Sequence, residues 1–300
     1  MSISIFGFRA LWSPYFAISL VLILIGYFLF MTKYRKKFIE SERLTIGQAV
    51  NFSLGIILLY IIKGSPVDLL GHLTFYAHMT QMAVLCLIIP QLFIYGIPKW
   101  IWRTLFKNNV IKKMFNLLSK PVVALIMFNG IFSIYHIPLV FDLVKTDIWL
   151  HAGYTSILFI VSFFFWWPLI NQLEDQHTLS GLKKVGYIFA GGALLLPACA
   201  LIIFSDVPLY ATFSDPNAWA KALELCVPGT TLAGLTLSGP EVFSSMSLLD
   251  DQQLGGIVMK IIQEVVYGFV LAKVFFSWYR NEQGETEAEK QHRLNPQLIE

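Results

Sequence analysis

Two histidines, two methionines and a glutamine lie between Gly71 and Met82, in an otherwise apolar part of the chain. Polar and ionisable side chains are costly at membrane depth, so they usually mark a functional site there. Imidazole and thioether groups are ligands for copper, and the thioether selects Cu(I). His78 and Met82 are four residues apart and therefore share one face of a helix. The spacing predicts a metal-binding face at the beginning of a long apolar helix.

The composition is typical of a polytopic membrane protein, because the chain is 56% hydrophobic and only 14% charged. We expect an all-α bundle with seven transmembrane helices in a single domain, residues 1–280, since membrane helices bury polar faces only against one another. A long outer loop, 206–251, precedes the last helix, and the polar residues 281–300 are expected to form a disordered cytoplasmic tail. The spans are about 20 residues long and lie at 11–31, 46–63, 72–95, 121–141, 149–170, 185–205 and 252–278.

Lysine and arginine are concentrated in the segments that follow the first, third, fifth and seventh spans. The positive-inside rule therefore predicts that the N-terminus is outside and the C-terminus inside. The net charge of +3 belongs to these loops and does not indicate a nucleic-acid partner; membrane lipid surrounds the chain instead. The three cysteines, Cys86, Cys199 and Cys226, form no Cys-x-x-C motif, so no disulfide framework is expected.

Four of the six histidines fall at the outer ends of spans in this topology. His72 and His78 are in the third span, His136 is near the end of the fourth, and His151 begins the fifth; the other two are His177 and His292. Consecutive antiparallel helices with short connections are usually neighbours, so we expect these imidazoles to meet below the outer surface.

We take His78, His136 and His151 as the primary ligands of a metal ion. Met82, Met79 and His72 are the expected soft or transfer ligands. Carboxylates, which hard cations require, are scarce at this depth, so copper is favoured. The sequence leaves open whether Cys199, Cys226, Met259 and Asp251 take part.

Each of these side chains also has a structural interpretation. Single histidines at helix ends are often interfacial, Met259 and Cys199 can simply fill the core, and Gln81 can form a hydrogen bond to another helix. A metal-free assembly scaffold is therefore one alternative.

Two further alternatives use the histidines for chemistry. A zinc-dependent intramembrane hydrolase needs three histidine ligands and a carboxylate base, for which Asp142 or Asp251 is available, but the last span contains no histidine. A haem site would use His78 and His136 as axial ligands.

Several motifs resemble those of the CtaG-type cytochrome c oxidase assembly factors, a seven-helix family of Gram-positive bacteria. The resemblance runs from about residue 45 to residue 275, and the opening residues 1–12 resemble the Bacillus branch. The motifs are His78-Met79-Thr80-Gln81, Tyr135-His136-Ile137-Pro138 and Asp251-Gln252-Gln253-Leu254-Gly255-Gly256.

The resemblance implies a multi-pass protein of the bacterial plasma membrane that is needed to mature a haem–copper oxidase and is not an enzyme. It implies that copper is delivered to oxidase subunit I or II, and it leaves open whether the chain forms a homodimer. The chain departs from the family pattern in two places. Many relatives have histidine where Met82 stands, and they have a second histidine after His151 where Tyr154 or Thr155 stands. These departures favour Cu(I) over Cu(II).

Overall fold

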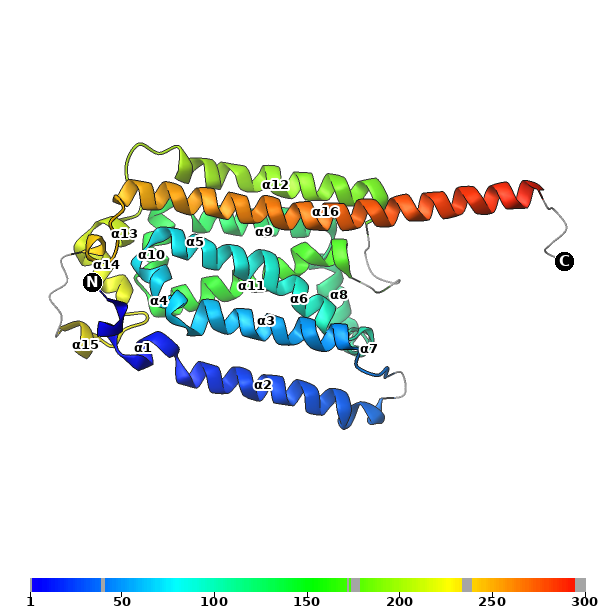
Figure 1. Cartoon of the computed structure of the whole chain (residues 1–300), viewed down its shortest axis with the longest axis horizontal. Coiled ribbons are helices and arrows are strands. Elements are labelled where there is room, and N and C mark those ends of the chain that lie inside the picture. The colour runs from blue at the N-terminus through cyan, green and yellow to red at the C-terminus, as the bar shows by residue number, and fades with distance from the viewer. Residues whose placement is uncertain (1, 39–40, 172, 174–178, 234–238, 295–300) are drawn as a thin grey trace.

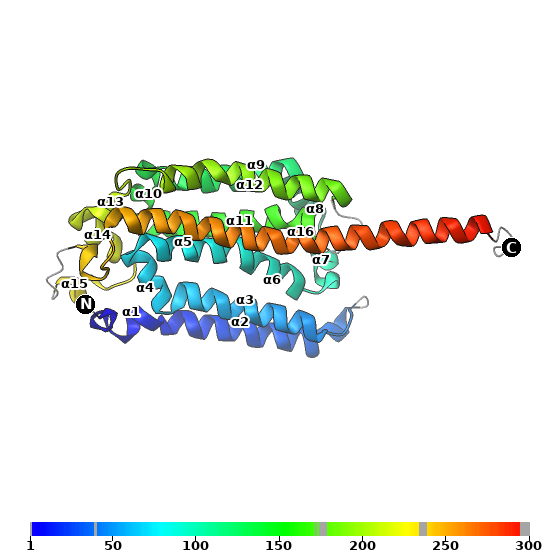
Figure 2. The ribbon, with the colours of Figure 1, turned by 45° about the horizontal axis from the view of Figure 1, so that its top comes forward.

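The computed structural model is built from helices that run side by side along one long axis (Figures 1 and 2). It describes residues 2–38, 41–171, 173, 179–233 and 239–294, and no strand occurs among them. Six helices are long and apolar enough to cross a membrane, and a bent helix pair raises the number to as many as seven. The prediction of a polytopic all-α bundle is therefore confirmed, whereas its orientation stays a prediction.

The long helices begin and end close to the predicted spans. The first candidate span combines α1 (Phe8–Trp12) with α2 (Pro14–Thr32), and the third combines α5 (Phe75–Ala83), a π-helix (Val84–Ile88) and α6 (Ile89–Gly96). The bent pair is α8 (Asn109–Leu118) and α9 (Pro121–Tyr135), at 68°. The others are α3 (Ile46–Gly64), α11 (Ile148–Ile170), α12 (Gly181–Ile203) and the first part of α16 (Leu248–Leu294).

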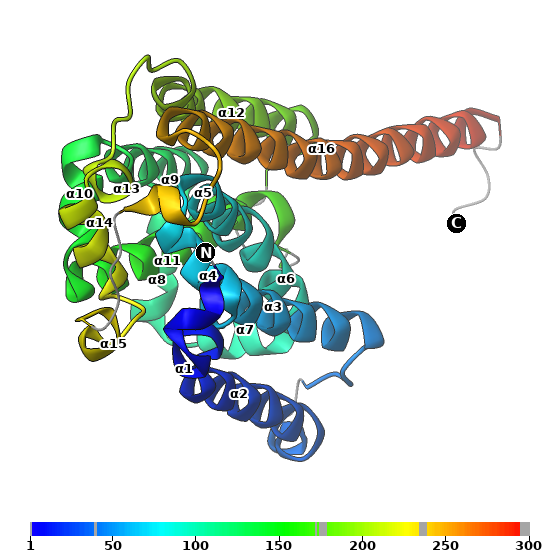
Figure 3. The same cartoon turned by 60° about the vertical axis from the view of Figure 1, so that its left-hand side comes forward.

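Short helices gather at the end of the bundle where the N-terminus lies (Figures 1 and 3). We call four of them the cap: α4 (Pro66–Leu73), α10 (Pro138–Lys145), α13 (Ala211–Ser214) and α14 (Pro216–Leu223). Within the cap, α4 contacts α14 and α10 contacts α13, while in the bundle α16 packs against α5 and α12. The remaining short helices are α7 (Lys99–Leu105), α15 (Gly229–Ala233) and the 3-10 turns Ile3–Phe6, Tyr34–Lys37 and Pro240–Val242.

Pro90 accounts for the π-helix in the third span. Proline has no N–H, so the carbonyl four residues earlier, that of Cys86, loses its helical partner. The indole of Trp166 on α11 donates to this carbonyl at 3.0 Å. The helix bulge therefore joins α5 and α11, two elements that carry predicted ligands.

Two predicted spans are wrong at the end where the histidines lie. The span predicted at 72–95 is broken at Thr74, whose backbone is extended (φ −134°, ψ 143°), so His72 lies on α4 and the long helix begins at Phe75. The span predicted at 121–141 ends at Tyr135, because Pro138 excludes a helical conformation at Ile137.

The tail also differs from the prediction of disorder over 281–300. The backbone of α16 remains helical to Leu294, since Glu, Gln, Ala, Lys and Arg, all good helix formers, dominate this polar segment. Residues 295–300 and His177 lie outside the described residues.

Candidate functional site

The break between α4 and α5 is held by side chains from distant parts of the chain. The carboxylate of Asp251 on α16 accepts hydrogen bonds from the backbone N–H groups of Phe75 (2.7 Å) and Tyr76 (3.0 Å). These two groups begin α5 and have no intrahelical partner. The break thus fixes His72 and His78 on either side of one backbone corner.

Gln81 connects the break between α4 and α5 to α3. The sequence predicts a hydrogen bond from this side chain to another helix. Its amide donates to the carbonyls of Ile62 (3.0 Å) and Val67 (2.7 Å). The Ile62 carbonyl is free because Pro66, four residues later, has no N–H. A side chain on Gly71 would overlap the Gln81 amide, so glycine at position 71 allows the close approach.

A second break, between α9 and α10, positions His136. Its Nδ1 lies 2.8 Å from the Phe132 carbonyl, and the Tyr210 hydroxyl donates to the His136 carbonyl at 2.9 Å. Asp142 on α10 accepts from the backbone N–H groups of Ala211 and Thr212, both at 3.0 Å, at the start of α13. The Phe132 carbonyl on α9 therefore orients the ring of His136, while the Tyr210 hydroxyl holds its backbone.

His78 and His136 face each other in the interior, and we call them the inner pair. Their ring centroids are 6.4 Å apart, and both residues are buried. Among the described residues, the Nε2 atoms of both rings have no hydrogen-bond partner although they are buried, and the same holds for the hydroxyl of Tyr135, whose ring is 5.9 Å from that of His78. Because buried polar atoms are nearly always satisfied, these orphan nitrogens are candidates for ligation.

His72 and His151 form an outer pair, with ring centroids 5.4 Å apart. The Nδ1 of His151 is also buried and has no hydrogen-bond partner in the part of the chain that the structure describes. Both residues line a cavity of about 400 Å³, which also contacts Lys63. The four predicted histidine ligands therefore lie at the cap end of the bundle as two pairs, one enclosed and one beside a cavity.

Lys145 at the end of α10 separates the two pairs. The side chain is buried; Nζ donates to the Gly71 carbonyl at 3.1 Å and lies 3.4 Å from His72 Nδ1. It also lies 5.2 Å from the ring centroid of Phe213. Burial, with the nearby positive charge of Lys63, lowers the pKa of Lys145 to about 7.

Replacing Lys145 by methionine should stabilise the protein at pH 6.5 and have little effect at pH 10. A lysine whose pKa is lowered by folding costs stability most at pH values below its folded pKa, and the cost disappears as pH rises to the unfolded value. We expect a gain of several kcal/mol at pH 6.5, because each unit by which folding lowers the pKa is worth about 1.4 kcal/mol; thermal unfolding in detergent measures it. The exposed Lys221→Met is the control; a pH-independent gain at position 145 would contradict this account.

The methionines contribute less to this arrangement than the spacing predicts. A Cβ built on Gly255 of α16 would lie 3.1 Å from Met79 Cγ, so Met79 belongs to the interface of α5 with α16. Met82 is buried one turn after His78, and Met259 and Cys199 are fully buried in the core.

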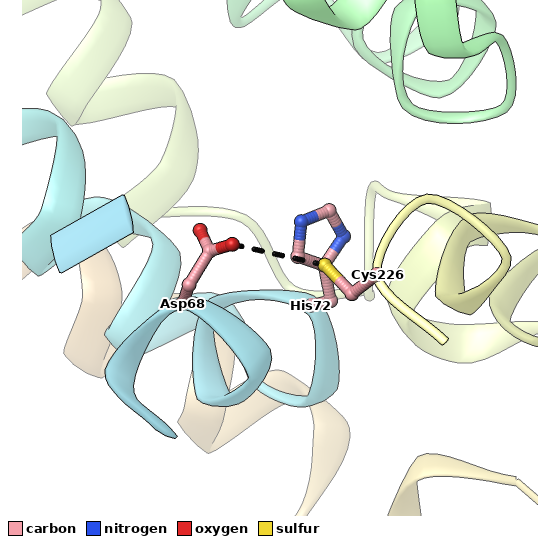
Figure 4. Close-up of side chains that lie close together, drawn as sticks. All are labelled: Asp68, His72 and Cys226. Atoms are coloured by element: carbon pink, nitrogen blue, oxygen red, sulfur yellow. Dashed lines mark hydrogen bonds between the residues drawn. The ribbon is translucent and has the colours of Figure 1, made fainter. Parts of the chain in front are cut away.

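Asp68 and Cys226 are potential ligands that sequence reasoning did not select. Both line the cavity of the outer pair together with His72, and Figure 4 shows the three side chains close together. Asp68 precedes His72 by four residues, a spacing that predicts a shared helix face. No comparable signal in the sequence indicates Cys226, because it lies in the irregular segment after α14.

The family model of the cytochrome c oxidase caa3 assembly factors (Caa3_CtaG) matches residues 25–281 of the chain. The chain belongs to this family. Membership confirms the resemblance drawn from the motifs.

The chain is also similar to uncharacterised proteins of Mycobacterium bovis and Mycobacterium tuberculosis. Each is 21% identical over 266 residues, which cover 82% of this chain and 36% of the relative. The chain therefore spans about a third of the length of these curated relatives. No solved structure matches the chain.

Proposed function

We propose that this assembly factor binds copper at the cap and delivers it to a subunit of a haem–copper oxidase. The observation that carries the proposal is a set of three buried imidazole nitrogens, on His78, His136 and His151, that find no hydrogen-bond partner among the described residues. They come from three elements that the cap brings together, and neutral imidazole is a good copper ligand. The proposal also expects the cap to face outward in a bacterial plasma membrane, as the distribution of Lys and Arg predicts.

The inner pair is the proposed position of the copper cargo. Two orphan Nε2 atoms supply a low coordination number, which suits Cu(I) and leaves the ion exchangeable. Phe132 and Phe141 surround the two rings, with centroids 4.3 Å from His136 and 5.1 Å from His78, so water has little access. Two-coordinate copper exchanges its ligands readily, which suits its later delivery to subunit I or II of the oxidase.

The carboxylates favour this proposal over a zinc hydrolase. A hydrolase needs a carboxylate free to activate water. Both Asp142 and Asp251 instead accept pairs of backbone hydrogen bonds at the starts of α13 and α5. Their position supports a structural role in shaping the cap.

The purified wild-type protein should retain about one copper ion per chain, and a variant with both His78→Ala and His136→Ala should lose at least about 90% of it. Removing two ligand nitrogens leaves no imidazole in the inner pair. Metal content of the detergent-purified proteins, together with oxidase activity in cells that depend on the variant, is the measurement.

His292→Ala is the matched control, because it removes a histidine that lies far along α16 from the cap. Full copper content in the double variant would refute the inner pair as the site. A copper-free double variant that still supports normal oxidase assembly would favour the metal-free scaffold, and zinc in place of copper would favour the hydrolase.

A further inference from the structure

Asp68, His72 and Cys226 form a cluster beside the outer pair, which we call the triad. Their potential ligand atoms, one from each side chain, all lie within 4.8 Å of one another. Figure 4 shows Asp68 and His72 on α4 with Cys226 next to them. Because Cys226 comes from the segment after α14, the triad forms only when α4 and α14 pack together in the cap.

The two carboxylate oxygens of Asp68 have different surroundings. Oδ1 accepts from Lys63 Nζ at 3.5 Å and from Gln81 Nε2 at 3.4 Å. Within the described residues, Oδ2 accepts one long contact, from Cys226 Sγ at 3.9 Å. One oxygen therefore ties α4 to α3 and α5, while the other is directed into the triad beside the sulfur.

The mixture of ligand types selects the class of ion. Thiolate and imidazole bind soft and borderline transition metals, whereas hard cations need a shell of oxygens. Ligands at about 2.0–2.3 Å from one ion lie roughly 3.3–4 Å from each other, so the triad needs a contraction of about 1 Å. Side-chain rotations at Cys226 and Asp68 are sufficient for a change of this size.

The triad is accessible, unlike the inner pair. All three residues line the cavity of about 400 Å³, and Cys226 is partly exposed while Cys86 and Cys199 are buried. An ion arriving through the cavity therefore meets Cys226 before any other thiol.

The triad is also connected to the inner pair by direct neighbours. His72 Nδ1 lies 3.4 Å from Lys145 Nζ, which lies 5.2 Å from the ring centroid of Phe213. The Phe213 ring is 6.3 Å from that of His78. Only Lys145 and Phe213 thus lie between His72, at the cavity, and His78 of the inner pair in this series of contacts.

We propose that the triad is a loading site at which Cu(I) first binds before it passes to the inner pair, a role that rests on the proposed function. On binding, Cu(I) forms a bond to Cys226 Sγ and replaces its proton, which leaves to water; no oxidation state changes. The positive charge of Lys63, which lines the same cavity, keeps the ion weakly held, as transfer to a second site requires.

The test follows alkylation of Cys226 by N-ethylmaleimide in the full-length protein in detergent, read by peptide mass spectrometry. Cu(I), set at defined free concentrations with a chelator, should slow this alkylation by about tenfold or more, and Asp68→Asn and His72→Gln should each raise the concentration needed for half protection by about tenfold. The same protection experiment is repeated with Zn(II) in place of Cu(I). No protection in the wild type, protection by Zn(II) alone, or protection unchanged in both variants would overturn the proposal.

His78→Ala separates this inference from the proposed function. It removes an inner ligand but leaves the triad intact, so protection of Cys226 should persist even where copper retention is lost. Should Asp68→Asn or His72→Gln fail to fold, Cys226→Ala tests the same site. The amount of Cu(I) that this variant binds in a titration should fall by about one ion per chain. An unchanged titration would overturn the loading site.

Discussion

Replacing Asp251 by alanine should lower the free energy of unfolding by about 3–5 kcal/mol, because hydrogen bonds to a buried charged group are worth about 1.5–3 kcal/mol each. The carboxylate accepts from Phe75 N–H and Tyr76 N–H at 2.7 and 3.0 Å. Without it, the first turn of α5 has buried donors with no partner. Since His78 lies in that turn, copper retention should fall together with thermal stability, and both are measured on the detergent-purified protein.

Asp250→Ala is the matched control for this prediction. Asp250 precedes Asp251 on α16 but is exposed, and its carboxylate accepts from the hydroxyl of Ser247 at 2.6 Å. Its loss should cost no more than about 1 kcal/mol, as for an exposed helix cap, and should leave copper retention unchanged. Equal losses of stability in the two variants would show that the negative charge at this end of α16, rather than the contact of Asp251 with α5, stabilises the protein.

The long helices were predictable from sequence because their signal is local. Apolar runs of the right length place α3 and α11 within one or two residues of the structure. The break at Thr74 was not predictable, since the groups that stabilise it, Asp251 and Gln81, reach it from other elements. A break that depends on distant partners leaves no periodic signal around Thr74.

The candidate site was predictable in its residue types and less so in its arrangement. Short connections correctly placed His72, His78, His136 and His151 at one end of the bundle. Their separation into two pairs depends on the breaks after α4 and α9, so spacing within a helix could not reveal it. The contribution of Cys226 depends on how the segment after α14 folds over α4, which composition does not determine.

Gly255→Leu is expected to cost about 3 kcal/mol or more, because overpacking of a close helix contact forces the neighbours apart. A Cβ at this position would lie 2.6 Å from Phe75 Cδ1 and 3.1 Å from Met79 Cγ on α5. The ring of Phe75 is itself buried against Tyr210, with centroids 4.6 Å apart, so it cannot move aside freely. The substitution should displace α5 from α16, with a lower thermal midpoint and loss of copper from the inner pair.

Gly268→Leu provides the comparison on the same helix. A Cβ on Gly268 meets no heavy atom within 4 Å, and leucine has a higher helix propensity than glycine by about 0.8 kcal/mol, so this variant should be neutral or slightly more stable. The contrast isolates close packing from helix propensity, since both substitutions add the same side chain to α16. If the two variants unfold at the same temperature, the Gly255 contact does not hold α5 in place, and the position of His78 must depend on other contacts such as those of Asp251.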